Sequence, residues 1–162
     1  MGDLMTCKIN ADTSNGLKFV SDTSGAVDFQ SNGTTRASID AAGNLKINSG
    51  LGSVETAYGC RAWIKLTGTG TAAEVESGNV ASITDRGTGT YTVTFTTAMP
   101  DVNYAAVVGT TWATGVTEHV TGLVYHDSPY SPAVGSVTAK TYNFTGNGAA
   151  IDATTVYVAV FR

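Results

Sequence analysis

The stretch "TYTVTFTTAM", residues 90–99, has the clearest alternation of apolar and polar side chains in the sequence. Tyr91, Val93 and Phe95 alternate with Thr92, Thr94 and Thr96. Successive side chains of a strand point to opposite faces, so a strand that buries one face shows this period of two. The stretch therefore predicts an antiparallel β-strand with one face on a core and the other facing solvent.

The composition extends this prediction to the whole chain. The 162 residues include 26 Thr and 19 Gly but only three Pro, and charged residues make up 14%. Threonine favours strands because its branched Cβ fits a pleated sheet, and glycine favours turns that need a positive φ. No segment has a sustained helical period. We therefore expect an all-β protein with many short connections.

The C-terminal two thirds contain a series of strand candidates. In residues 60–66, Cys60, Ala62, Ile64 and Leu66 share one face, and Arg61, Trp63 and Lys65 share the other. In residues 154–161, three valines alternate with Tyr157 and Phe161. Further candidates are residues 79–84, 103–110, 116–126 and 136–145. Strands of this number and spacing predict an antiparallel β-sandwich, jelly-roll-like, over residues 60–162.

The first fifty residues have the pattern of a β-meander. Strand candidates at 16–20, 26–30, 34–39 and 44–48 are separated by turns at 22–25, Asn32–Gly33 and 40–43. Asn-Gly is a strong signal for a two-residue hairpin. We therefore divide the chain into an anchoring tail (1–15), a β stalk (16–50), a connector (51–59) and the head (60–162).

The stalk holds few large apolar side chains for its length. Full burial of one contributes about 1.5–3 kcal/mol, whereas ordering each residue costs about 1–2 kcal/mol of backbone entropy. The meander must therefore dock on the head or share a core with copies of itself, and cyclic assembly would achieve the latter. The candidates for a trimer interface are Phe19, Val27, Phe29, Ile39, Leu45 and Ile47.

Charge and cysteine content argue against several classes of function. The net charge is −4 and no run of Lys or Arg occurs, so we expect neither nucleic-acid binding nor polybasic membrane attachment. No apolar run reaches the roughly 18 residues of a membrane span, and residues 1–14 lack the pattern of a signal peptide. Cys7 and Cys60 are expected to be reduced thiols, with no metal-binding spacing and no cofactor.

Candidate enzymatic and metal sites are weak. His119 and His126 lie seven residues apart, so on one continuous strand they would face opposite sides. Glu74 and Glu76 could share a strand face about 7 Å apart, which is within the range of a glycosidase pair, but this spacing alone is not specific. No Ser-His-Asp arrangement or phosphate-binding loop is present. We therefore expect no enzyme activity.

Aromatic residues in loops are better binding candidates. Loops on a rigid β scaffold often carry function, and aromatic faces bind sugar rings and protein surfaces. Trp112 lies in the turn-like segment 110–115, and residues 125–135 form a loop stiffened by two prolines. In the alternative interpretation, Trp112 fills the head core and Tyr130 covers the end of a sheet. The candidate receptor-binding residues are Trp112, Tyr125, His126, Asp127 and Tyr130.

Two long strings give the chain a family likeness. "GLKFVSDTSGAVDFQSNGTTRASIDAAGNLKI" (16–47) resembles shaft segments of tailed-bacteriophage fibre proteins, especially those of marine phages. The string that begins "YGCRAWIKLTGTG" and ends "TTAMPDVNYAAVVG" (58–109) resembles the head domain that follows such shafts. The ending "TTVYVAVFR" (154–162) is similar to their C-terminal strand, whereas residues 110–150 resemble no known segment.

The resemblance implies a non-enzymatic virion structural protein that is assembled in the host cytoplasm. On this basis the chain would form a homotrimer on the outer surface of the tail or capsid. Its N-terminal residues would bind another virion protein, and its head would attach to a host-surface polysaccharide or protein. One alternative is a capsid-attached decoration or head fibre protein, because few residues precede the shaft. A second alternative is a polysaccharide depolymerase.

Overall fold

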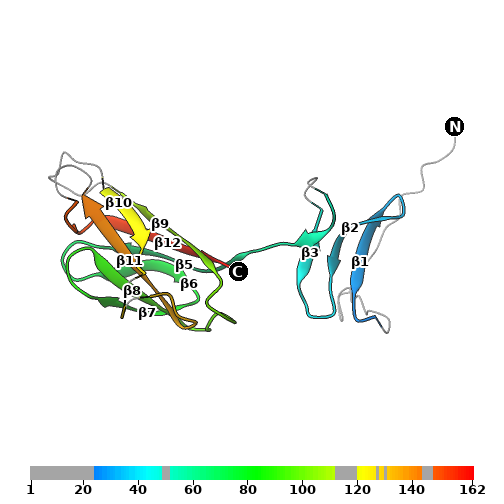
Figure 1. Ribbon diagram of the computed structural model, residues 1–162, viewed down its shortest axis with the longest axis horizontal. Helices are drawn as coiled ribbons and strands as arrows, with labels where there is room; N and C mark the ends of the chain where they lie inside the picture. The colour runs from blue at the N-terminus through cyan, green and yellow to red at the C-terminus, as the bar shows by residue number, and fades with distance from the viewer. Residues whose placement is uncertain (1–23, 49–51, 112–119, 127, 130, 144–147) are drawn as a thin grey trace, which may run out of the picture. The chain divides into compact units, whose positions relative to one another are not determined.

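The computed structural model describes residues 24–48, 52–111, 120–126, 128–129, 131–143 and 148–162. Every regular element in these residues is a strand, and the strands form three antiparallel four-stranded sheets (Figure 1). The expected all-β class is therefore confirmed. The chain divides into two compact units, Met1–Ala57 and Tyr58–Arg162, which we describe separately.

The N-terminal unit contains one sheet with the order β1-β2-β3-β4. Its strands are β1 (Val27–Ser31), β2 (Thr34–Ile39), β3 (Leu45–Ile47) and β4 (Glu55–Thr56). Three of them follow the predicted meander, and β4 adds a short strand inside the predicted connector. Asn32 and Gly33 have φ values of 56° and 73°, which confirms the expected two-residue hairpin turn with positive φ at both positions. The strand predicted at 16–20 lies outside the described residues.

The turn at residues 40–43 is held by the carboxylate of Asp40. Asp40 Oδ1 accepts hydrogen bonds from the backbone N–H of Ala42 (3.0 Å) and of Asn44 (2.9 Å). Gly43 has a φ of +83° and donates its N–H to the Asp40 carbonyl at 2.8 Å. The Asn44 backbone is the largest of several donors and charges that lower the pKa of Asp40. These local bonds fix the β2–β3 register, in which Ile39 pairs with Leu45.

The C-terminal unit contains the other two sheets. One has the order β6-β5-β12-β9 and the other has the order β10-β11-β8-β7. The first consists of β5 (Cys60–Thr67), β6 (Ala73–Gly78), β9 (Ala105–Thr110) and β12 (Thr155–Phe161). The second consists of β7 (Val80–Asp85), β8 (Thr90–Phe95), β10 (Val120–Val124) and β11 (Ser136–Asn143).

Both sheets of this unit contribute to one buried apolar cluster. The first sheet supplies Ala62, Ile64, Leu66, Val156, Val158 and Val160. The second supplies Tyr91, Val93, Phe95, Val137 and Ala139. These residues alternate with more exposed neighbours along β5 and β12, as the sequence predicted. The alternation therefore identifies the core side of β12 and of residues 62–66, but Cys60, which was expected on the same side, is exposed. In β8 the predicted core face is buried, and Thr92 on the face expected in solvent is buried as well.

Asn79 forms the corner at which the chain passes from the first sheet to the second. It joins β6 to β7 and has a positive φ of 58°, a conformation that asparagine tolerates better than most residues. Its side-chain amide donates to the carbonyls of Arg61 (2.9 Å) and Thr97 (3.0 Å). Its Oδ1 accepts the N–H of Thr97 at 2.7 Å. One side chain thus ties the corner to β5 and to the segment after β8.

Two further polar contacts join distant parts of this unit. The buried hydroxyl of Tyr91 lies 3.0 Å from the Gly68 carbonyl and 3.1 Å from Asp152 Oδ1; burial raises the pKa of this phenol. Arg162 donates to both carboxylate oxygens of Asp101, with Nε–Oδ1 at 3.1 Å and Nη2–Oδ2 at 2.6 Å. The last residue of the chain is therefore fixed to the segment before β9.

Substitution of Asn79 should separate backbone strain from lost hydrogen bonds. Asn79→Gly removes the side-chain bonds but tolerates the positive φ, whereas Asn79→Ala removes the bonds and adds strain. We expect both variants to be less stable than the wild type, with Asn79→Ala lower than Asn79→Gly by about 1 kcal/mol. Urea unfolding measures both free energies. Equal stabilities would contradict the role of the backbone conformation.

The Asp101–Arg162 pair should make stability depend on pH in the acid range. The Arg162 hydrogen bonds are the largest cause that lowers the pKa of Asp101 below its ordinary value of 3.8. The stabilisation that the ionised Asp101 gives to the folded state is therefore complete above pH 3.8. It is lost as the pH falls through the lower pKa that Asp101 has in the folded state. Asp101→Asn should lower the urea midpoint at about pH 7, and the difference from wild type should shrink below about pH 4. A difference that stays constant with pH would contradict the ion pair.

Candidate functional site

Tyr125, one of the predicted receptor-binding residues, lies directly after β10 beside a lysine. Its backbone N–H donates to the Thr138 carbonyl at 2.8 Å, which continues the β10–β11 ladder by one residue. Lys140 Nζ lies 4.3 Å from the centroid of the Tyr125 ring and 5.2 Å from that of Tyr142. We call Tyr125, Lys140 and Tyr142 the lysine cluster. An ammonium group between two aromatic rings holds both in place by cation–π attraction.

The lysine cluster keeps its positive charge firmly. The hydrogen bond with the Tyr142 side chain is the largest cause that raises the pKa of Lys140 above its ordinary value. Because Lys140 is only half-buried, its charge remains available at the surface of the sheet. The cluster can therefore offer a cation and aromatic edges to a ligand.

The other predicted loop residues are only partly placed. His126 is exposed, and its carbonyl accepts a hydrogen bond from Ser131 Oγ at 2.7 Å. Trp112, Asp127 and Tyr130 lie outside the described residues. The predicted grouping of five loop residues therefore stays a prediction, with Tyr125 and His126 as its two described members.

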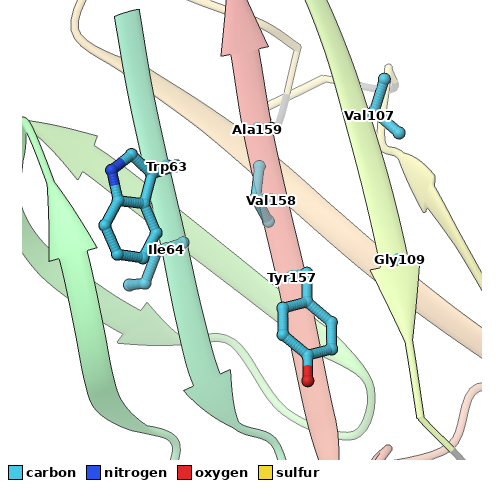
Figure 2. A pocket seen from close by; sticks show the side chains of 7 residues that line it. All are labelled: Trp63, Ile64, Val107, Gly109, Tyr157, Val158 and Ala159. Atoms are coloured by element: carbon cyan, nitrogen blue, oxygen red, sulfur yellow. The ribbon is translucent and has the colours of Figure 1, made fainter. Parts of the chain in front are cut away.

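A second surface feature lies on the first sheet of the C-terminal unit, on the face turned away from the core. The exposed fractions of Trp63, Tyr157 and Val107 are 41%, 42% and 59%. They border a shallow depression of about 400 Å³ (Figure 2). Gly109 and Ala159 also line it; glycine has no side chain and alanine only a methyl group, so the space between the larger side chains stays open. We call this feature the aromatic depression.

Strand pairing explains why these residues meet. Ala159 pairs with Trp63 on one side and with Val107 on the other, so the three form one row across β5, β12 and β9. The next row contains Lys65, Tyr157 and Gly109. The sequence predicts that Trp63 and Tyr157 lie on the faces turned away from the core, but it does not mark them as binding residues. Their alternation with core residues was the signal that could have identified them.

Gly78 makes room for the indole of Trp63. The two residues are paired across β5 and β6, and a Cβ on Gly78 would lie 2.5 Å from Trp63 Nε1. Any larger residue at position 78 would therefore push the indole out of its position. The glycine thus determines where the ring lies on the surface.

The described residues contain little that supports catalysis. They hold no group of three or more His, Cys, Asp or Glu side chains that could bind a metal, and none of their segments forms a helix able to span a membrane. Glu74 and Glu76 are exposed on β6, but a register shift in the β5–β6 pairing interrupts the alternation there. Cys60 is a free, exposed thiol, whereas Cys7 and His119 lie outside the described residues.

The lysine cluster can be tested by its effect on stability. Lys140→Met keeps the length of the side chain but removes the charge, so the cation–π contribution of about 0.5–1 kcal/mol should be lost. A double-mutant cycle with Tyr125→Leu should show coupling of that size in urea unfolding. Lys65→Met, on the other sheet, is the matched control and should not couple with Tyr125→Leu. Additive effects of Lys140→Met and Tyr125→Leu would contradict the contact.

Comparison with known proteins does not assign a family to the chain. No family model, no curated protein and no solved structure matches it. A function must therefore be inferred from the residues and their arrangement. In the C-terminal unit the surface features are the lysine cluster and the aromatic depression.

Proposed function

We propose that this chain is a non-enzymatic virion structural protein of a tailed phage, a trimeric short fibre with a distal head for host-surface attachment. In this proposal the N-terminal unit is the oligomerising stalk and the C-terminal unit is the head. The long likeness of residues 16–47 and 58–109 to phage shaft and head segments supports it. The exposed apolar face of the N-terminal sheet is the single structural observation that carries it.

That face is built from two cross-strand rows. Val27, Ile39 and Leu45 form one row, and Phe29, Ala37 and Ile47 form the other. Directly paired residues project to the same side of a sheet, so all six side chains share one face, which we call the apolar stalk face. In the single chain four of these side chains are about half exposed: the exposed fraction is 47% for Phe29, 42% for Ile39, 50% for Leu45 and 42% for Ile47.

The opposite face of the same sheet is polar. Asp28 pairs with Ser38, which pairs with Lys46, so this row alternates with the two apolar ones. A sheet with one apolar face must cover that face to be stable in water. Copies of the chain arranged around an axis would each supply one such face to a shared core. Phe19, the sixth interface candidate from the sequence, lies outside the described residues.

For the head we propose a β-sandwich. The shared apolar cluster between its two sheets supports this architecture. Two hairpins, β5–β6 and β7–β8, each stay within one sheet. The pair β10–β11 does the same, whereas the pairing of β12 with β5 and β9, and of β8 with β11, joins strands that are not consecutive, as in the Greek-key connections of a jelly-roll-like sandwich.

Charged substitutions on the apolar stalk face should impair assembly before they unfold the head. Ile39→Asp and Ile47→Asp each place a carboxylate in the proposed shared core, where desolvation disfavours it. Light scattering should give three times the 16.6 kDa chain mass for the wild type and a lower mass for both variants. Their circular dichroism should keep the strand signal of the head. Thr56→Asp, opposite Lys46 on the polar face, is the matched control and should leave the mass unchanged.

A wild-type protein that stays monomeric at micromolar concentration would overturn the shared core. Position on the particle is a separate test. Electron microscopy of particles labelled with an antibody against the head should place the chain on a projecting fibre. Label spread over the capsid shell would favour the decoration protein instead.

A further inference from the structure

We propose that the aromatic depression on the β6-β5-β12-β9 sheet is a glycan-binding site that takes neutral pyranose rings. This inference rests on the proposed role in host attachment and assigns it a ligand class and a location. The site consists of Trp63, Tyr157, Val107, Ala159 and Gly109, none of which belongs to the loop residues predicted from the sequence.

The shape of the surface suits a chain of sugar rings. Trp63 and Tyr157 come from neighbouring strands and are diagonal cross-strand neighbours, because Trp63 pairs with Ala159 and Tyr157 pairs with Lys65. In Figure 2 the Tyr157 ring lies over β12, and the Trp63 ring lies diagonally from it on the far side of β5. Diagonal neighbours are within reach of aromatic side chains, so adjoining sugar units of one chain can contact both rings.

The chemistry of the surface is complementary to that of a pyranose. The C–H groups on one face of a pyranose pack against an aromatic ring, and its hydroxyl groups stay in water or bond to polar side chains. Lys65 and Glu76 are paired with each other and lie in the same row as Tyr157. They supply a donor and an acceptor at the edge of the apolar surface, which is the combination that a sugar with hydroxyl groups around its ring requires.

The exposed area argues against a second protein as the occupant. Trp63, Val107, Tyr157 and Phe161 are between 38% and 59% exposed. With side chains of about 150–250 Å² each, they leave roughly 350 Å² of apolar surface uncovered. Each partner in a stable protein interface buries about 800 Å², of which a little over half is apolar, so this patch alone falls short of such an interface and is of the size that is often functional on a monomer.

Backbone pairing argues against an extended peptide. Ala159 lies on β12, which is hydrogen-bonded to β5 on one side and to β9 on the other. A peptide that adds a strand needs an open sheet edge, and the centre of this depression has none. The half-exposed side chains around it also make the site too shallow to enclose an acyl chain, and the net charge of −4 disfavours a nucleic acid.

The test uses a variant that fills the depression and keeps both aromatic residues. Ala159→Leu adds a larger side chain between Trp63 and Val107, on the outer face of a strand whose core residues are unchanged. The assembled full-length protein is titrated with cellohexaose, maltohexaose and chitohexaose, and the Trp63 indole N–H resonance is followed by NMR. We expect saturable binding of at least one probe and a loss of affinity of tenfold or more in Ala159→Leu and in Tyr157→Ala.

Control variants separate this site from others. Tyr58→Ala removes a tyrosine that is 67% exposed and lies outside the depression, so it should bind like the wild type. Tyr125→Ala changes the lysine cluster and should likewise bind the probes like the wild type. Binding that is lost in Tyr125→Ala but kept in Ala159→Leu would overturn the inference, as would the absence of binding to all three probes.

The binding titration and the oligomeric state test the glycan site and the fibre proposal separately. A trimeric protein that binds none of the probes would overturn the glycan site and leave the fibre proposal standing. A monomeric protein whose binding is lost in Ala159→Leu would support the glycan site and overturn the trimer. A wild-type protein that self-associates and becomes monomeric in Ala159→Leu would show that this face binds another copy instead.

Discussion

The structure of the C-terminal unit depends on the pairing of β12 with two partners. Because β5 and β9 lie on either side of it, all three strands share one register and one pleat. Val156, Val158 and Val160 then point into the core. The residues between them point the other way, so the same pairing that completes the core also builds the outer row of Trp63, Ala159 and Val107. The aromatic depression is therefore a direct product of the hydrogen-bonding pattern.

The two outer faces of this unit differ in chemistry. On the second sheet, Thr92 and Thr138 are paired across β8 and β11, and their hydroxyls lie 3.0 Å apart. Thr92 and Thr138 are themselves buried, and Lys140 and Tyr142 lie on the same side of β11 as Thr138. The first sheet instead presents apolar and aromatic side chains around small residues. Proposed attachment through the aromatic face does not involve the lysine cluster, which lies on the other sheet.

Local chemistry made part of this fold predictable. Alternation identified the core sides of residues 62–66, 91–95 and 156–160, but not the exposure of Cys60 or the burial of Thr92. The turns at Asn32–Gly33 and 40–43 could be predicted because their bonds form within a few residues. Strand partners could not be predicted in this way, since the pairing of β12 with β5 joins residues about ninety positions apart. The sequence does not predict β6, because its side chains are mostly polar, and so it does not reveal that Gly78 positions Trp63.

The apolar stalk face and the completed head core have different consequences for the rate of assembly. The core of the head is supplied by one chain, so its folding is a first-order process and does not depend on protein concentration. The apolar stalk face is buried only when copies of the chain meet. Its burial is therefore a reaction of higher order, whose rate depends on protein concentration. In the proposed fibre, dilution would therefore delay the stalk without delaying the head, and a newly made chain would carry a finished head before it meets its partners.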